Sequence, residues 1–212
     1  MYRTSINIVQ EQNDIQNQKQ IKNVNSKKYK NTKKNADLDN KCGKEYLERA
    51  KKTRGDENQQ EKKEEIKLAA KNLIDSAEKY AKANAIVHGE ENNKYVKDSE
   101  SSKKKQKCFK ESVLKTHTFA VIRQAPSNSK VLSKEEAAIL DKYADPTQKL
   151  YSSHTALAYG DVQPELDDVE KINNITTKLK GHVEKQEKEI KEKERKEKVE
   201  KIVDDLIEEH LK

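Results

Sequence analysis

The sequence is poor in the residues from which large cores and catalytic pockets are built. Its 212 residues include no Trp, two Phe and one Met, and hydrophobic residues make up only 32% of the chain. An ordinary globular chain is about 45–50% apolar. A catalytic pocket requires a packed and largely apolar cavity, which this composition hardly provides. We therefore expect a protein that is not an enzyme.

Cysteine, histidine and glycine are too few or too scattered for several kinds of site. Cys42 and Cys108 lack the second pair that a zinc site would need, and they indicate free thiols in a reducing compartment. No two of the five histidines are four residues apart with a carboxylate between them, as a zinc-binding helix requires. The five glycines form no phosphate-binding loop. We expect no metal, no cofactor and no small-molecule substrate.

Long apolar runs are absent as well. The first residues, MYRTSINIVQEQND, have no apolar segment of the kind found in signal peptides. No stretch approaches the length needed to cross a membrane. We therefore expect an intracellular protein without a membrane partner.

Charge is abundant, since Asp, Glu, Lys and Arg make up 39% of the chain. It is most regular in residues 165–212, which contain no Pro and one Gly. Between Glu184 and Lys201, six Glu residues each precede a Lys by four positions, an order that stabilises an exposed helix by roughly 0.2–0.5 kcal/mol per pair. A helix over this whole segment would be about 70 Å long. The pattern predicts an elongated, all-α chain with a long, solvent-exposed, Lys/Glu-rich C-terminal helix and shorter helices before it.

The two ends of this long helix differ from its middle. Apolar residues recur at three- and four-residue steps near 166–179 and again near 199–211, whereas Ile190 is the only aliphatic residue in 184–198. The pattern predicts two amphipathic faces that need a partner. We expect the middle to stand in water as a stiff spacer that holds the two faces apart.

The N-terminal region, residues 1–55, is basic and rich in Asn and Gln. Residues 1–54 contain 14 Lys or Arg against 6 Asp or Glu, and the apolar residues follow no sustained period. A mostly disordered tail is therefore predicted. Lysine clusters here and near residue 105 either keep the chain in solution or bind a polyanion, such as RNA or an acidic protein surface. The candidate polyanion-binding residues are Lys27, Lys28, Lys30, Lys33, Lys34, Lys103, Lys104, Lys105, Lys107 and Lys110.

Three segments lie between the tail and the long helix. Residues 56–89 predict an amphipathic helix, with a capping box formed by Asp56 and Gln59 and with Gly89 at its end. Residues 90–132 predict a polar, basic linker with an extended segment at 116–123, because the Thr, Phe, Val and Ile of that run favour strands. Residues 133–164 predict a short helix, opened by a Ser133–Glu136 capping box, followed by an irregular segment.

The apolar residues of these elements are too few and too dispersed to predict a single compact core. Their faces are instead expected to contact partner proteins. The candidate partner-docking residues are Ile66, Leu73, Tyr80, Phe119, Val121, Ile139, Leu140, Tyr143, Ile172, Leu179, Val199, Ile202 and Leu206.

Four phrases follow one another in an order that is found in a known family. They are a tyrosine-initiated phrase (Tyr46, Arg49, Ala50, Lys51, Arg54), a glycine–acidic step to a valine–lysine pair (Gly89, Glu90, Val96, Lys97), a D-x-x-Y-A-D-like segment (Asp141, Lys142, Tyr143, Ala144, Asp145), and an isoleucine–leucine helix (Ile175, Thr177, Lys178, Leu179) that runs into the charged repeat. Together they resemble the RED family of spliceosomal proteins, which is named for its Arg/Glu/Asp repeats.

The resemblance implies a nuclear, non-enzymatic scaffold subunit of the pre-mRNA splicing machinery that docks on protein partners such as a WD-repeat subunit. The polar composition also suits a cytoskeletal or axonemal microtubule-associated protein, with the long helix as a ruler and the basic tail on acidic tubulin. We expect an interaction subunit of a large assembly. A nuclear ribonucleoprotein is preferred, and a cytoskeletal or ciliary location is the alternative.

Overall fold

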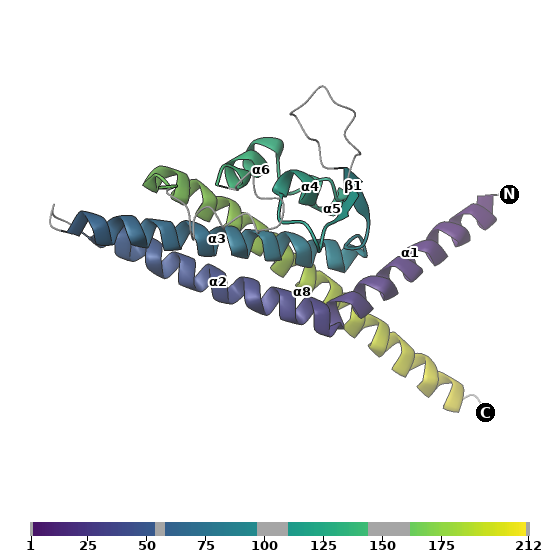
Figure 1. Ribbon diagram of the computed structural model, residues 1–212. Coiled ribbons are helices and arrows are strands. Elements are labelled where there is room, and N and C mark those ends of the chain that lie inside the picture. Colours follow the sequence, from purple (N-terminus) through teal and green to yellow (C-terminus); the bar gives the residue numbers. More distant parts are fainter. Residues whose placement is uncertain (1, 54–57, 97–109, 144–161, 211–212) are drawn as a thin grey trace, which may run out of the picture.

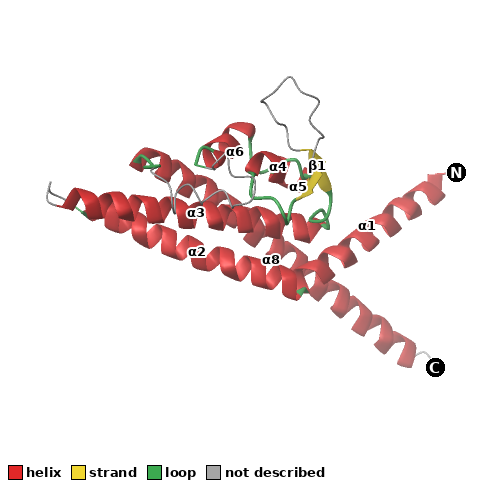
Figure 2. Cartoon of the chain, viewed as in Figure 1, coloured by secondary structure: helices red, strands yellow, loops and turns green. Residues whose placement is uncertain are grey.

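The structure is a computed structural model that describes residues 2–53, 58–96, 110–143 and 162–210. Side chains are described for residues 12–53, 58–93, 112–143 and 162–210. The helices are α1 (Tyr2–Asn25), α2 (Lys27–Lys52), α3 (Gln59–His88), α4 (Phe119–Ile122), α5 (Pro126–Ser129), α6 (Lys134–Asp141) and α8 (Leu166–His210). Strand β1 (Lys94–Val96) pairs antiparallel with β2 (Lys110–Ser112) and places Tyr95 opposite Glu111. The fold is helical (Figure 2), and the predicted long C-terminal helix is confirmed.

Helices α2 and α3 form a closely packed hairpin. The buried residues Tyr29, Ala36, Gly43 and Ala50 of α2 follow one another at seven-residue steps, which is about two helical turns, and therefore lie on one face. The facing side of α3 is rich in alanine. Small side chains bring the two backbones close together: a Cβ atom added to Gly43 would lie 2.7 Å from the Cγ atom of Leu73.

The first half of α8 completes the bundle. Its residues Val169, Ile172, Leu179 and Val183 are buried, and they pack mainly against α3. The hydroxyl of Thr176, which is fully buried, lies 2.8 Å from the carbonyl oxygen of Ile172 in its own helix and 3.1 Å from that of Leu73, so it can donate to either. This half of α8 is thus fixed to the body by both apolar contact and a buried polar contact.

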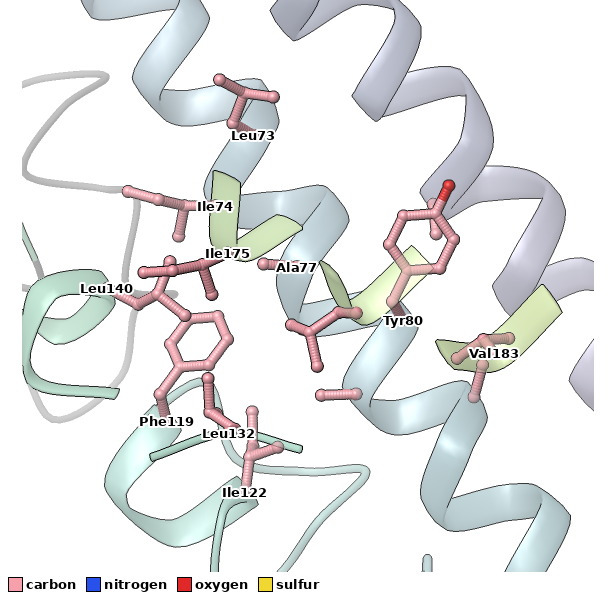
Figure 3. Packing of buried hydrophobic residues seen from close by; sticks show 14 of the residues in the cluster. Leu73, Ile74, Ala77, Tyr80, Phe119, Ile122, Leu132, Leu140, Ile175 and Val183 are labelled. Carbon is pink, nitrogen blue, oxygen red and sulfur yellow. The ribbon is translucent and has the colours of Figure 1, made fainter. Parts of the chain in front are cut away.

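Residues 112–143 cover another side of α3, and they correct two predictions. The run 116–123 is not extended, because it contains the helical turn α4, and residues 90–132 are not merely a linker, because they contain β1, β2, α4 and α5. The carboxylate of Asp141 accepts from the backbone N–H groups of Phe119 (2.8 Å) and Ala120 (2.9 Å). This carboxylate caps α4 from far along the chain, so the local sequence does not reveal the helix. Figure 3 shows α4 and its neighbours adding Phe119, Ile122, Leu132 and Leu140 to the apolar interior.

Two other predicted helix ends are confirmed. Gly89 follows α3 with a left-handed backbone (φ 70°), and its N–H donates to the carbonyl groups of the last turn. The Ser133 hydroxyl accepts from the N–H of Glu136, and the Glu136 carboxylate accepts from the N–H of Ser133. Asp56, which was predicted to open the helix before Gly89, lies outside the described residues.

The prediction of a disordered N-terminal tail is wrong. Residues 2–52 form α1 and α2, and Ser26 caps α2 by accepting from the N–H of Tyr29 over 3.2 Å. The buried face of α2 is made largely of Ala, Gly and a polar residue, Asn40. Between Tyr29 and Leu47 this face has only small or polar residues, and their burial depends on α3.

The apolar side chains also share one interior, although no single core was predicted. One cluster of buried hydrophobic residues extends from α1 through α2, α3 and the 112–143 segment to α8. It includes Tyr29, Leu73, Phe119, Leu140 and Ile172. The sequence does not indicate this shared core, because each element contributes only a few of its apolar residues and these lie far apart along the chain.

The ends of the chain diverge from the bundle as two helical arms (Figure 1), one formed by the start of α1 and the other by the end of α8. The predicted solvated spacer, residues 184–198, is partly covered. Ile190 is only 5% exposed, and Glu194 and Glu197 accept side-chain hydrogen bonds from α1. Beyond this crossing, every residue from 198 to 210 is exposed. We call residues 199–210 the C-arm.

Candidate interaction surfaces

The structure divides the predicted partner-docking residues into two groups. Nine of them are buried within the chain: Ile66, Leu73, Tyr80, Phe119, Val121, Leu140, Tyr143, Ile172 and Leu179. Ile139 is half-buried and packs against the same core. Val199, Ile202 and Leu206 are exposed by 59%, 58% and 51%. The first group therefore docks on the chain's own elements, and among these predicted docking residues those of the C-arm are the ones that stay exposed.

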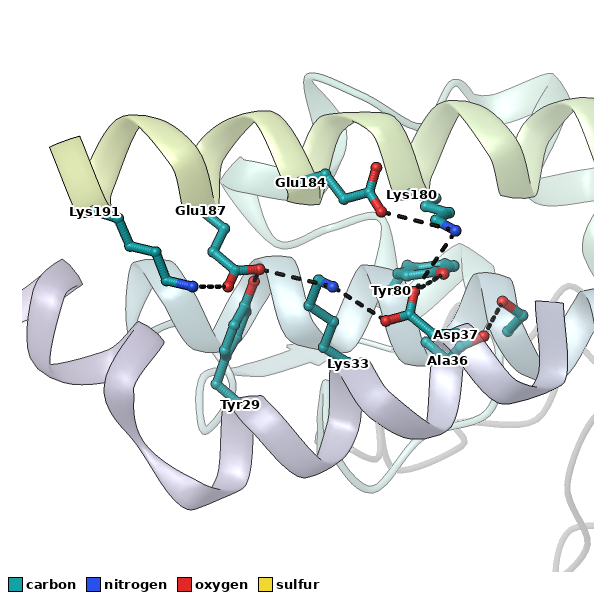
Figure 4. A network of polar contacts seen from close by, with 10 residues as sticks. Tyr29, Lys33, Ala36, Asp37, Tyr80, Lys180, Glu184, Glu187 and Lys191 are labelled. Atoms are coloured by element: carbon teal, nitrogen blue, oxygen red, sulfur yellow. Dashed lines mark hydrogen bonds and ion pairs between the residues drawn. The ribbon is translucent and has the colours of Figure 1, made fainter. Parts of the chain in front are cut away.

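A polar network joins α2, α3 and α8 (Figure 4). The hydroxyl of Tyr29 donates to Glu187 over 3.2 Å, and that of Tyr80 donates to Asp37 over 2.5 Å. Lys33 bridges the two carboxylates, with its ammonium 3.1 Å from Asp37 and 3.8 Å from Glu187. The network orients the middle of α8 over the start of α2.

Both tyrosines of the network are held neutral. Burial, followed by the charge of Glu187, raises the pKa of Tyr29 above its usual range. Burial, followed by a hydrogen bond to Asp37, likewise raises the pKa of Tyr80. The neutral hydroxyls remain hydrogen-bond donors to Glu187 and Asp37, and these bonds hold the helices together.

A second ionic cluster lies between α3 and the segment that precedes α4. The Glu78 carboxylate is buried and lies 2.7 Å from the Lys82 ammonium and 3.0 Å from Nδ1 of His117. Burial opposes ionisation of Glu78, but the hydrogen bond to His117 and the charge of Lys82 outweigh it, and the pKa of Glu78 is lowered. The two groups thus keep a buried carboxylate charged, which secures residues 116–118 to the bundle.

His88, at the end of α3, lies near enough to His182 of α8 for its charge to act on that ring. Nε2 of His88 lies 3.0 Å from Nε2 of Gln186. Burial lowers the pKa of His88, and burial together with the charge of His88 lowers the pKa of His182. The neutral forms of both rings are therefore favoured in the folded chain.

The first lysine cluster lies on α2, whereas the second falls largely outside the described residues. Lys27, Lys28, Lys30 and Lys34 are exposed. Lys28 pairs with Glu91 over 3.3 Å, and Lys33 belongs to the network described above. Lys103, Lys104, Lys105 and Lys107 are not described, and Lys110 is placed in β2 by its backbone alone. Of the predicted polyanion-binding residues, Lys27, Lys30 and Lys34 remain exposed on α2 without an ion pair to any residue that the structure describes.

The C-arm has an uncovered apolar stripe. Val199, Ile202, Val203, Leu206 and Ile207 are each exposed by 47–59%, and they recur at three- and four-residue steps. Such a stripe occupies one side of a helix. Five large apolar side chains gathered on twelve residues differ from the single exposed apolar residues that are normal on protein surfaces.

The stripe lies on the side of α8 opposite to the one that faces the body. Val183 and Ile190, which are buried, are seven residues or about two turns apart and so share a side. Val199 comes nine residues after Ile190, or about 2.5 turns, and Leu206 follows Val199 by about two turns. Because α8 is one continuous helix to His210, its apolar side switches by about half a turn between Ile190 and Val199.

Sequence reasoning missed the polar network and the ionic cluster. Glu187, Glu184 and Lys191 were grouped with the other charges of the Lys/Glu run, although Glu187 has specific partners on α2. A signal was present: Tyr29, Ala36, Gly43 and Ala50 form a seven-residue repeat, which is typical of a helix packed along its length. Nothing local marks which Glu of the run would face that helix.

No protein family, no curated protein and no solved structure matches the chain in sequence or fold comparisons. Within the described part of the chain, no group of three or more His, Cys, Asp or Glu side chains is placed to hold a metal ion. The helices of the described residues include none that is long and apolar enough to cross a membrane.

Proposed function

We propose that this chain is a non-enzymatic scaffold subunit that binds a partner protein through its C-arm. One observation carries the proposal: the body buries most of its large apolar side chains, while Val199, Ile202 and Leu206 stay exposed side by side on a helix that extends beyond it. An amphipathic helix binds proteins by laying its apolar stripe into a complementary surface. The body would then serve as a rigid mount that sets the position and direction of the arm.

A large nuclear ribonucleoprotein assembly, such as the splicing machinery, is the proposed setting. The exposed lysines Lys27, Lys30 and Lys34 of α2 support it, since a basic face attracts polyanions. The same lysines would suit the acidic surface of a microtubule, which makes a cytoskeletal scaffold the second candidate. The two candidates differ in the polyanion and share the role of the arm.

The docking role of the arm is tested by the double substitution Ile202→Asp with Leu206→Asp. We expect it to abolish the capture of partner proteins by the full chain from nuclear extract. Binding would bury two carboxylates that have no opposite charge beside them, which is strongly unfavourable. Circular dichroism should show that the helix content is nearly unchanged. The matched control is Lys201→Asp with Glu208→Asp, which changes the net charge of the arm equally and lies on its other side.

The setting is tested by comparing two assays on the same protein. The first candidate is supported if the wild-type chain captures nuclear ribonucleoprotein components and the triple variant Lys27→Ala, Lys30→Ala, Lys34→Ala does not. Co-sedimentation with microtubules that is lost in the same variant would support the second. If the wild-type chain does neither, both settings are wrong.

A further inference from the structure

The C-arm carries acidic residues along both borders of its apolar stripe. On one border, Asp205 and Glu209 follow Ile202 and Leu206 by three positions, and on the other, Glu200 and Asp204 precede Val203 and Ile207 by three. Residues three apart on a helix are neighbours on its surface. The apolar stripe is therefore framed by carboxylates on both sides.

This frame sets the arm apart from the rest of the chain. Residues 199–210 contain five carboxylates and one lysine, a net charge of −4, whereas the whole chain has a net charge of +7. The run just before the arm alternates Glu and Lys and pairs them internally, as Lys198 with Glu194 over 2.8 Å. In the described part of the arm, the carboxylates bordering the stripe have no such lysine partners.

We infer that the occupant of the C-arm is a partner protein whose apolar helix or helix-binding surface is bordered by Lys and Arg. This inference rests on the proposed docking role of the arm and adds the chemistry of the partner. Residues that border an apolar seam decide which helices pair, because they meet the border residues of the partner. Four carboxylates, two on each border, select a basic partner and reject an acidic one.

A second copy of this chain does not meet that description. Two C-arms packed stripe against stripe would place Asp204, Asp205 and Glu209 beside carboxylates of the other copy, which is unfavourable. The C-arm of one copy is also not expected to bind the basic face of α2 in another copy. Among the described residues, Leu38 is the only exposed large apolar residue of that face.

The position of the stripe fixes the direction from which the partner approaches. The stripe lies about half a turn away from the side that α8 turns to the body, so the chain's own core elements do not reach it. The partner therefore approaches from the side of α8 that faces away from α1 and α3. Binding there leaves the bundle and its polar network intact.

Two synthetic helical peptides with the same Leu/Ile stripe, one bordered by Lys and the other by Glu, serve as probes. Their dissociation constants for the full chain are measured by fluorescence anisotropy at about 50 and 300 mM salt. We expect the Lys peptide to bind at least about tenfold more tightly at low salt, and the ratio to fall at high salt because exposed ion pairs are screened. The variant Asp204→Lys, Asp205→Lys, Glu209→Lys should reverse the preference.

The control variant Glu45→Lys, Glu48→Lys, Glu64→Lys makes the same change of net charge on exposed positions of the body. It should keep the preference for the Lys peptide, and a reversal in this control would overturn the inference, because the whole-chain charge would then explain it. Equal binding of the two peptides, or binding of neither, overturns it as well. So does sedimentation that shows a dimer lost in the arm variant, since the occupant would then be a second copy.

The variant Ile202→Asp with Leu206→Asp separates this inference from the proposed function. If it loses the peptides while the charge variant keeps the original preference, the arm is a docking site and the inference about the partner's charge is wrong. If it binds the Lys peptide as tightly as the wild type does, the arm is not the docking site, and the proposed function fails with the inference.

Discussion

Residues 166–190 and residues 199–210 belong to one continuous helix, yet they relate to the rest of the chain in opposite ways. The first part buries Ile172, Leu179 and Ile190 against the bundle, and the second exposes Ile202 and Leu206 by more than half. Both parts are amphipathic. The difference between them is the direction of the apolar side, which turns away from the body after Ile190.

This difference separates two sources of helix stability. The inner part is stabilised by tertiary packing, as most helices in proteins are. The C-arm continues a helix that is already nucleated, and adding residues to an existing helix costs little. Internal Glu–Lys pairs such as Glu192 with Lys196 and Glu194 with Lys198 support the stretch that leads into it. A helix can thus carry an uncovered apolar stripe when its other end is anchored.

The largest difference in stability is expected when an isoleucine is replaced by aspartate in each of the two parts of α8. Ile172→Asp should lower the free energy of unfolding by about 4 kcal/mol or more, because it places a charge in a fully buried site. Ile202→Asp should change it by less than about 0.5 kcal/mol. Urea unfolding followed by circular dichroism measures both. Equal losses would show that the C-arm belongs to the core.

An intermediate effect is expected from the network that holds the inner part of α8. Asp37→Ala removes the acceptor of the buried Tyr80 hydroxyl and a partner of Lys33, and it should cost about 2 kcal/mol. The control Glu48→Ala breaks only an exposed pair with Lys51 and should cost a few tenths of a kcal/mol. Urea unfolding of the two variants tests this ordering, and a loss in the control as large as that in Asp37→Ala would contradict it.

Two glycines should respond to alanine in opposite directions. Gly43→Ala should lower the free energy of unfolding by about 1 kcal/mol, because the new Cβ meets Leu73 at 2.7 Å, closer than atoms normally pack. Gly181→Ala should raise it by up to about 1 kcal/mol, since its Cβ meets nothing within 4 Å and alanine favours the helix. Thermal unfolding shows the signs directly. If Gly43→Ala stabilises the chain, α2 and α3 are less closely packed than described.

The smallest effect concerns pH and the inner part of α8. The pKa values of His88 and His182 are lowered in the folded chain, so the unfolded chain binds protons more readily. Stability should be complete above about pH 6.5, the unfolded value, and should fall as the pH decreases below it. The groups that modulate this are Glu90, Lys130, Lys185 and Glu189. Unfolding between about pH 7.5 and 5.5 should be less pH-dependent in His88→Gln, and an unchanged dependence would exclude the His88 ring as its source.

The parts of the fold that were predicted correctly are those with local signals. Gly89 ends α3, Ser133 and Glu136 cap α6, and the Glu–Lys spacing predicts α8; each of these features is complete within a few residues. The stripe at Ile202 and Leu206 was recognised for the same reason. Its orientation relative to the body could also have been derived from residue spacing, once Ile190 was known to face inward.

The parts that were missed depend on residues far apart in sequence. The start of α4 is capped by Asp141, and the small-residue face around Gly43 is meaningful only beside the alanines of α3. Glu187 became a partner of Tyr29 only because α8 crosses α2 at that point. The roles of these residues depend on which helices pack together. A single sequence does not show that packing when neither the residue types nor their spacing are unusual.

The inner part of α8 is also the last piece of the core that a ribosome makes. About 100 residues separate the end of α3 from Ile190, which at ~5–20 residues per second corresponds to about 5–20 s of synthesis. During that time the side of α3 around Ile74 and Ala77, which the finished protein buries completely, has no α8 to cover it. The nascent chain therefore presents an alanine-rich apolar surface for seconds before α8 covers it, and transiently exposed surface of this kind is prone to aggregation.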